Sequence, residues 1–257
     1  MRITPFKIVN ILSIVALIVL VWLYQNIQVS GWWFLALFLV YSSALVLGAI
    51  YIRWNFYLKS FDKGENKNWI ALTFDDGPAG KTAAILDILK NENVPATFFC
   101  IGKNVSDNSE LVKRWDDEGH LIGNHSFNHG FNFDWQSAKQ MAEEIEQTNA
   151  TIRSIIGKSP AFFRPPYGVT NPNVAKAVKL TQVHSIAWNV RSFDTTAKNP
   201  DQLLARILNQ LRGGDIILLH DSMPITCEIL TELIHKARQK GFTFVRVDKM
   251  LGLDAYA

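Results

Sequence analysis

Two adjacent carboxylates mark the first place in this 257-residue chain where side chains of catalytic type gather. Asp75 and Asp76 follow the apolar run of residues 69–74 and precede Gly77 and Pro78. Neighbouring side chains of a strand point in opposite directions, so one carboxylate can face a metal ion while the other faces a substrate. The glycine and proline then turn the chain away. A turn whose aspartate caps the next helix fits this segment alone equally well.

Two histidines form the second group. His125 and His129 are four residues apart, which predicts a helical turn with both imidazoles on one face and within reach of one ion. An exposed helical pair is the alternative for this segment alone. Gly123 and Gly130 flank the histidines, and a strand of buried character precedes them, so the context favours a site at the end of that strand.

Three further polar groups follow in order along the chain. The stiff loop Arg164-Pro165-Pro166 could hold a guanidinium against a carboxylate. Asp194 ends one later segment, and His220 closes another that is apolar. Each of them alone also fits a rigid turn or a structural histidine. The joint occurrence of all these segments in one order is what indicates a catalytic site.

The elements that must position these groups are short strands alternating with amphipathic helices, a pattern typical of βαβ units and a mainly parallel sheet. Side chains that do chemistry in such folds lie at the carboxyl ends of the strands, and roughly 180 residues suit a barrel smaller than the usual eight-unit one of about 250. The expected strands are residues 69–74, 96–101, 120–123, 182–188, 215–219 and 242–247. The expected helices are residues 82–91, 137–156, 200–211 and 226–240.

Two uncharged apolar runs, residues 8–24 and 31–52, precede this region, and each is close to the roughly 20 residues that cross a bilayer. Aromatic residues gather at their ends, as at a membrane interface. A cleaved signal peptide is the alternative for the first run, but its length, the lack of a small-residue cleavage site and the second run favour two transmembrane helices. The expected organisation is a membrane anchor in residues 1–60, a linker in 61–68, a catalytic domain in 69–250 and a tail in 251–257.

Composition excludes other classes of protein. The net charge of +3 comes from 26 basic and 23 acidic side chains spread along the chain, which argues against a nucleic-acid partner. Only Cys100 and Cys227 are present, so neither a disulfide framework nor a cysteine metal site is expected.

Five segments together resemble the ordered motifs of the polysaccharide deacetylase family, also called the NodB-homology family or carbohydrate esterase family four. They are residues 73–78 (TFDDGP), 125–129 (HSFNH), 164–168 (RPPYG), Asp194 and residues 218–220 (LLH). The resemblance implies a distorted (β/α) barrel of about seven units and a divalent metal, usually Zn²⁺. It also implies a hydrolase of linear amides that removes N-acetyl or O-acetyl groups from a polysaccharide such as peptidoglycan or a chitin-like glycan.

The same resemblance implies a role for each site residue. Asp76, His125 and His129 would bind the metal. Asp75 would be the general base, oriented by Arg164, and His220 would be the general acid, tuned by Asp194. The Tyr167 backbone N–H would help hold the oxyanion, and Leu218 would line the acetyl-methyl pocket. Where the family often has aspartate and tryptophan, this chain has Arg191 and Thr195, which predicts a changed groove and substrate preference.

Two other functions fit parts of the pattern. A non-catalytic, membrane-anchored glycan-binding protein would lack the proton donor and the three ligands found here. An iron oxygenase also uses two histidines and one carboxylate, but the order of the ligands and the doubled aspartate argue against it. The expected partners are an N-acetylated glycan and the lipid bilayer, and no protein partner is predicted.

The side of the membrane on which the domain lies stays open. Arg2 and Lys7 precede the first run, Arg53 and Lys59 follow the second, and the loop between the runs has no charge. The positive-inside rule then places both ends in the cytoplasm, whereas an enzyme of cell-surface glycans is expected outside. The expected location is the cell membrane, with two spans.

Overall fold

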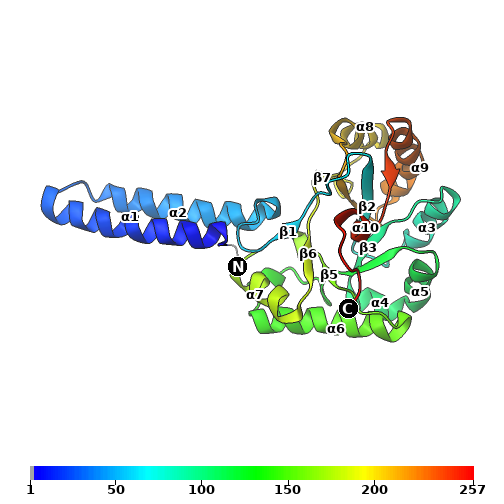
Figure 1. The fold of residues 1–257 in the computed structure, drawn as a ribbon, viewed down its shortest axis with the longest axis horizontal. Coiled ribbons are helices and arrows are strands. Elements are labelled where there is room, and N and C mark those ends of the chain that lie inside the picture. The colour runs from blue at the N-terminus through cyan, green and yellow to red at the C-terminus, as the bar shows by residue number, and fades with distance from the viewer. Residues whose placement is uncertain (1–2) are drawn as a thin grey trace.

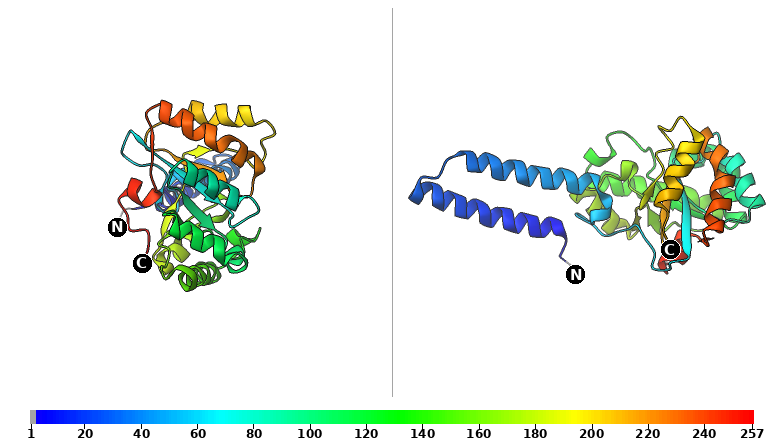
Figure 2. Two further views of the ribbon diagram at one scale, coloured as in Figure 1. Left: turned by 90° about the vertical axis from the view of Figure 1, so that its right-hand side faces the viewer. Right: turned by 90° about the horizontal axis from the view of Figure 1, so that it is seen from above.

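Parallel strands form one nine-stranded curved sheet in the computed structural model, which describes residues 3–257. The order is β1-β6-β5-β4-β3-β2-β8-β7, with β9 beside β2, and helices surround the sheet (Figures 1 and 2). Within the described residues β1 and β7 do not pair with each other, so the barrel stays open. The predicted distorted (β/α) barrel is confirmed.

Each predicted strand and helix of the domain has a counterpart in the structure. The strands are β1 (Ser60–Phe61), β2 (Trp69–Asp75), β3 (Thr97–Cys100), β4 (Leu121–Asn124), β5 (Phe162–Phe163), β6 (His184–Ile186), β7 (Val190–Arg191), β8 (Ile216–His220) and β9 (Thr243–Phe244). The helices are α1 (Pro5–Ile27), α2 (Trp32–Ile50), α3 (Thr82–Asn91), α4 (Gly102–Asp107), α5 (Ser109–Asp117), α6 (Ala138–Ile156), α7 (Pro172–Thr181), α8 (Pro200–Gln210), α9 (Pro224–Gln239) and α10 (Val247–Leu251).

Alternation along β2 separates the core from the site. Leu72 and Phe74 belong to the large apolar cluster packed under the helices, where Phe74 stacks on Phe98 with ring centroids 5.1 Å apart. Thr73 and Asp75 point to the opposite face because successive strand side chains alternate. They are nonetheless buried, since that face is the inside of the curved sheet.

The structure corrects several predicted boundaries. The strand expected over 182–188 is reduced to β6, and the strand expected over 242–247 is reduced to β9 because α10 begins at Val247. Four helices, α4, α5, α7 and α10, were not expected. The start of α7 carried a readable signal, since the Asn171 side chain caps it and Pro172 occupies its first turn.

The segments expected to be a linker and a tail lie against the domain instead. Ser60 and Phe61 pair with β6, and the Gly64 N–H donates to the Gly214 carbonyl at 2.8 Å. At the other end the Ile122 N–H donates to the Tyr256 hydroxyl at 3.1 Å, and the Ala257 N–H donates to the Ser159 carbonyl at 2.9 Å. Backbone groups beside a sheet need partners, and pairing with the domain satisfies them.

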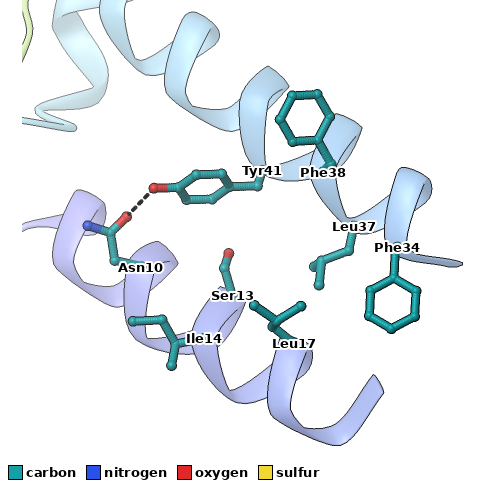
Figure 3. Close-up of a pocket in the computed structure, with 8 residues that line it drawn as sticks. All are labelled: Asn10, Ser13, Ile14, Leu17, Phe34, Leu37, Phe38 and Tyr41. Atoms are coloured by element: carbon teal, nitrogen blue, oxygen red, sulfur yellow. Dashed lines mark hydrogen bonds between the residues drawn. The ribbon is translucent and has the colours of Figure 1, made fainter. Parts of the chain in front are cut away.

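The two N-terminal helices form an antiparallel hairpin that projects away from the domain (Figures 1 and 2). Both are long and apolar enough to cross a membrane, and α2 ends at Ile50, two residues before the predicted boundary. Asn10 and Tyr41 point toward each other across the hairpin, and the Tyr41 hydroxyl donates to Asn10 Oδ1 at 3.0 Å (Figure 3). Such polar contacts hold helices together where lipid offers no partner.

The base of the hairpin is fixed to the domain. The Phe6 N–H donates to the Phe56 carbonyl at 3.1 Å, and the Thr170 N–H donates to the Ala49 carbonyl at 3.0 Å. The ring of Phe56 packs against Gly48, where a side chain would not fit. The start of α1 and the end of α2 therefore both lie next to the domain.

Candidate active site

Strand register brings the predicted residues to one end of the sheet. β2 and β8 pair in parallel, with Asp75 directly opposite His220. His125 follows the last residue of β4, and Arg164 follows the last residue of β5. Carboxyl ends of parallel strands meet at one edge, so segments far apart in sequence meet there too.

A buried ion pair joins Arg164 to Asp75. Arg164 Nη1 lies 2.6 Å from Asp75 Oδ1 and 2.8 Å from Thr73 Oγ1. The other guanidinium donors bind the carbonyls of Ile186 and Ala187 at 3.2 and 3.1 Å. Burial raises the pKa of Asp75, and the Arg164 charge opposes that shift. The arginine thus holds one carboxylate oxygen while the other lies toward the histidines.

A second pair couples His220 to Asp194. His220 Nδ1 lies 2.8 Å from Asp194 Oδ1, which fixes that nitrogen as the donor and leaves Nε2 facing the cavity. The His220 backbone N–H and the Thr226 hydroxyl each donate to Asp194 Oδ2 at 2.7 Å. Burial lowers the pKa of His220, but the hydrogen bond and charge of Asp194 outweigh it, so the pKa is raised overall. The predicted proximity of the two side chains is confirmed.

Asp76, His125 and His129 form a set that could hold a metal ion, because their ligand atoms lie within 4.8 Å of one another. Asp76 Oδ1 is 3.5 Å from Nε2 of each histidine. His125 Nδ1 lies 2.7 Å from the Arg164 carbonyl, which can only accept, so Nε2 keeps its lone pair for an ion. Burial, assisted by the charge of His129, lowers the pKa of His125 to about 3, which favours the neutral, ligating form.

The helical turn predicted for the two histidines is wrong. Residues 125–130 form an irregular loop in which Ser126 and His129 adopt left-handed backbone angles, with φ of 65° and 49°. Asp76 is also left-handed, with φ of 73°. Such angles are costly for residues other than glycine and persist where the surroundings impose them, often at functional sites. The loop, rather than a helix face, brings the two imidazoles together.

All the predicted site residues except Arg164 and Asp194 line one cavity of about 260 Å³. Its walls are Asp75, Asp76, His125, His129, Tyr167, Gly168, Trp188, Arg191, Thr195, Leu218 and His220. Arg164 and Asp194 lie fully buried behind it, each against the side chain it holds. Arg191 and Thr195 both line the cavity, so the two departures from the family pattern lie beside the other candidate site residues.

Supporting residues that the sequence motifs do not contain hold the site from behind. The buried Glu144 accepts from the backbone N–H groups of Phe127 and Asn128 at 3.2 and 3.0 Å and so fixes the histidine loop. Asp221 is buried under Gly77, leaving no room for a side chain there, and burial raises its pKa to about 7. Glu144 carried a weak signal, since it lies on the apolar side of a predicted helix, where a charge needs partners.

Comparison with known proteins agrees with this geometry. The sequence pattern of the polysaccharide deacetylase family matches residues 62–186. The peptidoglycan-N-acetylglucosamine deacetylase PgdA of Listeria monocytogenes is 36% identical over 191 residues, which are 74% of this chain and 40% of that protein. This chain therefore spans less than half the length of that relative.

Two further relatives match over most of their own length. The peptidoglycan-N-acetylmuramic acid deacetylase PdaA of Bacillus subtilis is 35% identical over 187 residues, which are 71% of each chain. The crystal structure of the Bc1960 peptidoglycan N-acetylglucosamine deacetylase superimposes with a TM-score of 0.73 at 32% identity, covering 77% of this chain and 94% of that one. With its open parallel barrel and matches of this extent, the chain belongs to the polysaccharide deacetylase family.

Proposed function

We propose that this chain is a metal-dependent hydrolase that removes N-acetyl groups from sugar residues of a glycan such as peptidoglycan. One observation carries the proposal: a set of three metal-ligand side chains, a separate carboxylate and a separate histidine all face one cavity. Hydrolysis of an amide needs an activated water, a stabilised oxyanion and a proton for the departing amine. The similarity to the two peptidoglycan deacetylases of Listeria monocytogenes and Bacillus subtilis supports the substrate class.

In the proposed reaction, Asp75 accepts a proton from a water molecule while the oxygen of that water attacks the acetyl carbon. A carboxylate whose pKa is raised by burial is a better proton acceptor than an exposed one, and Arg164 holds it in position. The C–N bond then breaks, and His220 gives the nitrogen its proton, leaving acetate and a free amine. Tyr167 would present its backbone N–H to the oxyanion, and Leu218 would contact the acetyl methyl group.

We propose Zn²⁺ as the ion that Asp76, His125 and His129 hold. Two imidazoles and one carboxylate are a ligand set typical of catalytic zinc and leave further positions open. The bound ion would supply Lewis-acid polarisation of the acetyl carbonyl oxygen. The orientation of His125 by the Arg164 carbonyl supports a ligand role, since histidine ligands commonly donate their second N–H to such an acceptor.

The buried pairs favour this function over the two alternatives. A glycan-binding protein has no need of a carboxylate held by a buried arginine, and an iron oxygenase has no need of a histidine whose pKa a buried aspartate raises. Both features serve proton transfer.

We also propose that α1 and α2 anchor the enzyme in a lipid bilayer. Most of the apolar side chains of the hairpin are exposed and none is buried, so the domain does not cover them. The hairpin projects from the domain, and its base lies where a membrane surface would meet the domain (Figure 1).

Substituting Asp75 and Asp76 one at a time should separate the loss of catalysis from the loss of metal binding. Asp75→Asn should lower acetate release from an N-acetylglucosamine oligomer by about 10²–10⁴-fold and keep one metal ion per chain, because the base does not hold the ion. Asp76→Ala should lose both acetate release and the metal ion. Acetate assays and elemental analysis measure the two quantities. Loss of metal in Asp75→Asn would show that the roles are reversed.

Removal of His220 should affect amides far more than activated esters. His220→Ala should lower the rate on an N-acetylated oligomer by about 10²-fold or more, while 4-nitrophenyl acetate hydrolysis changes little, because nitrophenolate leaves without a proton. Steady-state kinetics on both substrates measure the effect. Equal losses on the two would mean that this histidine is structural.

Membrane anchoring should survive conditions that remove peripheral proteins. After carbonate extraction at high pH, the full chain should stay in the membrane pellet, whereas a variant lacking residues 1–50 should be released, since burial of two apolar helices is retained at that pH. Immunoblots of pellet and supernatant give the result. Release of the full chain by carbonate would contradict the proposed anchor.

A further inference from the structure

A second cavity, of about 550 Å³, lies beside the catalytic cavity and is not used by the chemistry above. Its walls are the membrane-proximal segment (residues 50–54) with Asp62, the region around β7, and Gln210 at the end of α8. Trp188 and Arg191 line both cavities, so the two adjoin there. We propose that this second cavity binds a further sugar residue of the glycan whose acetyl group is removed, which rests on the proposed function.

The lining has the chemistry that sugar rings require. Tyr51 and Trp54 stack on each other with centroids 4.9 Å apart, and they are 52% and 54% exposed. Sugars combine apolar C–H faces, which aromatic rings contact, with hydroxyl edges, which polar groups bind. Arg53 Nε lies 3.4 Å from Asp62 Oδ2, so hydrogen-bond donors and acceptors are both present. The volume falls within the about 300–1,000 Å³ of small-molecule sites.

At the boundary between the two cavities, the side chain of Arg191 lies over two aromatic rings. The Arg191 guanidinium lies 4.8 Å from the ring centroid of Phe193 and 5.9 Å from that of Trp188. An arginine can stack on a sugar as well as on an aromatic ring and donates from a planar fork. Arg191 thus offers a surface over which a glycan could pass from one cavity to the other.

The wall from the anchor is held rigidly against the domain. Ile52 is buried, and the Trp54 N–H donates to the Tyr51 carbonyl at 2.8 Å. A few residues later, Ser60 enters the sheet through its pairing with Ser185. A preformed wall loses little entropy when a ligand binds, which favours a binding site over a mobile flap.

Aromatic residues at the end of a span are also typical of a membrane interface. Here, however, Tyr51 and Trp54 line a cavity whose opposite wall belongs to the catalytic domain. Asp62 and Asn189 in the same cavity offer acceptor oxygens to sugar hydroxyl groups. These observations favour the glycan.

The test compares Trp54→Ala with the wild-type full chain in detergent micelles and in bilayer nanodiscs. Trp54→Ala should lower kcat/KM for an N-acetylglucosamine pentamer about threefold to tenfold, the range of one lost aromatic contact. Hydrolysis of 4-nitrophenyl acetate, too small to reach the second cavity, should stay within about twofold. Trp32→Ala, an exposed aromatic at the far end of the hairpin, is the matched control and should change neither.

Calorimetric titration of the pentamer gives a second readout that does not need turnover. Trp54→Ala should raise the Kd for the pentamer by the same factor by which it lowers kcat/KM. If the wild type released no acetate, the proposed function would fail, and this titration would still decide the subsite. An unchanged Kd and unchanged kcat/KM would overturn the subsite, as would a loss seen in nanodiscs and absent in micelles, which would assign Trp54 to the membrane surface.

Discussion

The buried ion pair between Arg164 and Asp75 is the constraint on which the rest of the site depends. Both side chains are removed from water, and a buried charge left without its partner costs about 3–5 kcal/mol. Arg164 also donates to Thr73 and to two carbonyls at the end of β6, and its own carbonyl orients His125. One side chain thus links the strand that carries the proposed base to the loop that carries a proposed metal ligand.

Three neighbouring aspartates differ in burial and in their hydrogen-bond partners, which suits them to different roles. Asp75 is buried beside an arginine, Asp194 is buried beside a histidine, and Asp76 lies partly exposed between two histidines. Burial raises the pKa of Asp75, whereas the pKa of Asp194 is lowered, because its hydrogen bonds and the charge of His220 outweigh its burial. Environments of this kind separate acid, base and ligand roles within a single cavity.

The alternation of strands and helices predicted the parallel sheet and placed the polar groups at strand ends, because that pattern is local. The partners of Arg164 and Asp194 came from the family resemblance, since their pairs join residues far apart in the chain. The sequence did not predict the loop that carries His125 and His129, which contains left-handed residues and whose Asn128 N–H donates to Glu144 of α6. Nor did it predict that residues 61–68 and 251–257 pack on the domain, because such pairing is long-range. For the same reason the membrane-proximal wall of the second cavity is visible only in three dimensions.

The central claim is that this cavity hydrolyses an N-acetyl group with the help of an ion held by Asp76, His125 and His129. The most direct measurement is acetate release from an N-acetylglucosamine pentamer by the full chain, before chelation, after chelation and after addition of Zn²⁺, with metal content determined at each stage. Activity should be lost with the metal and return when one equivalent per chain is restored. Full activity in metal-free protein, or no acetate release from the fully loaded protein, would contradict it.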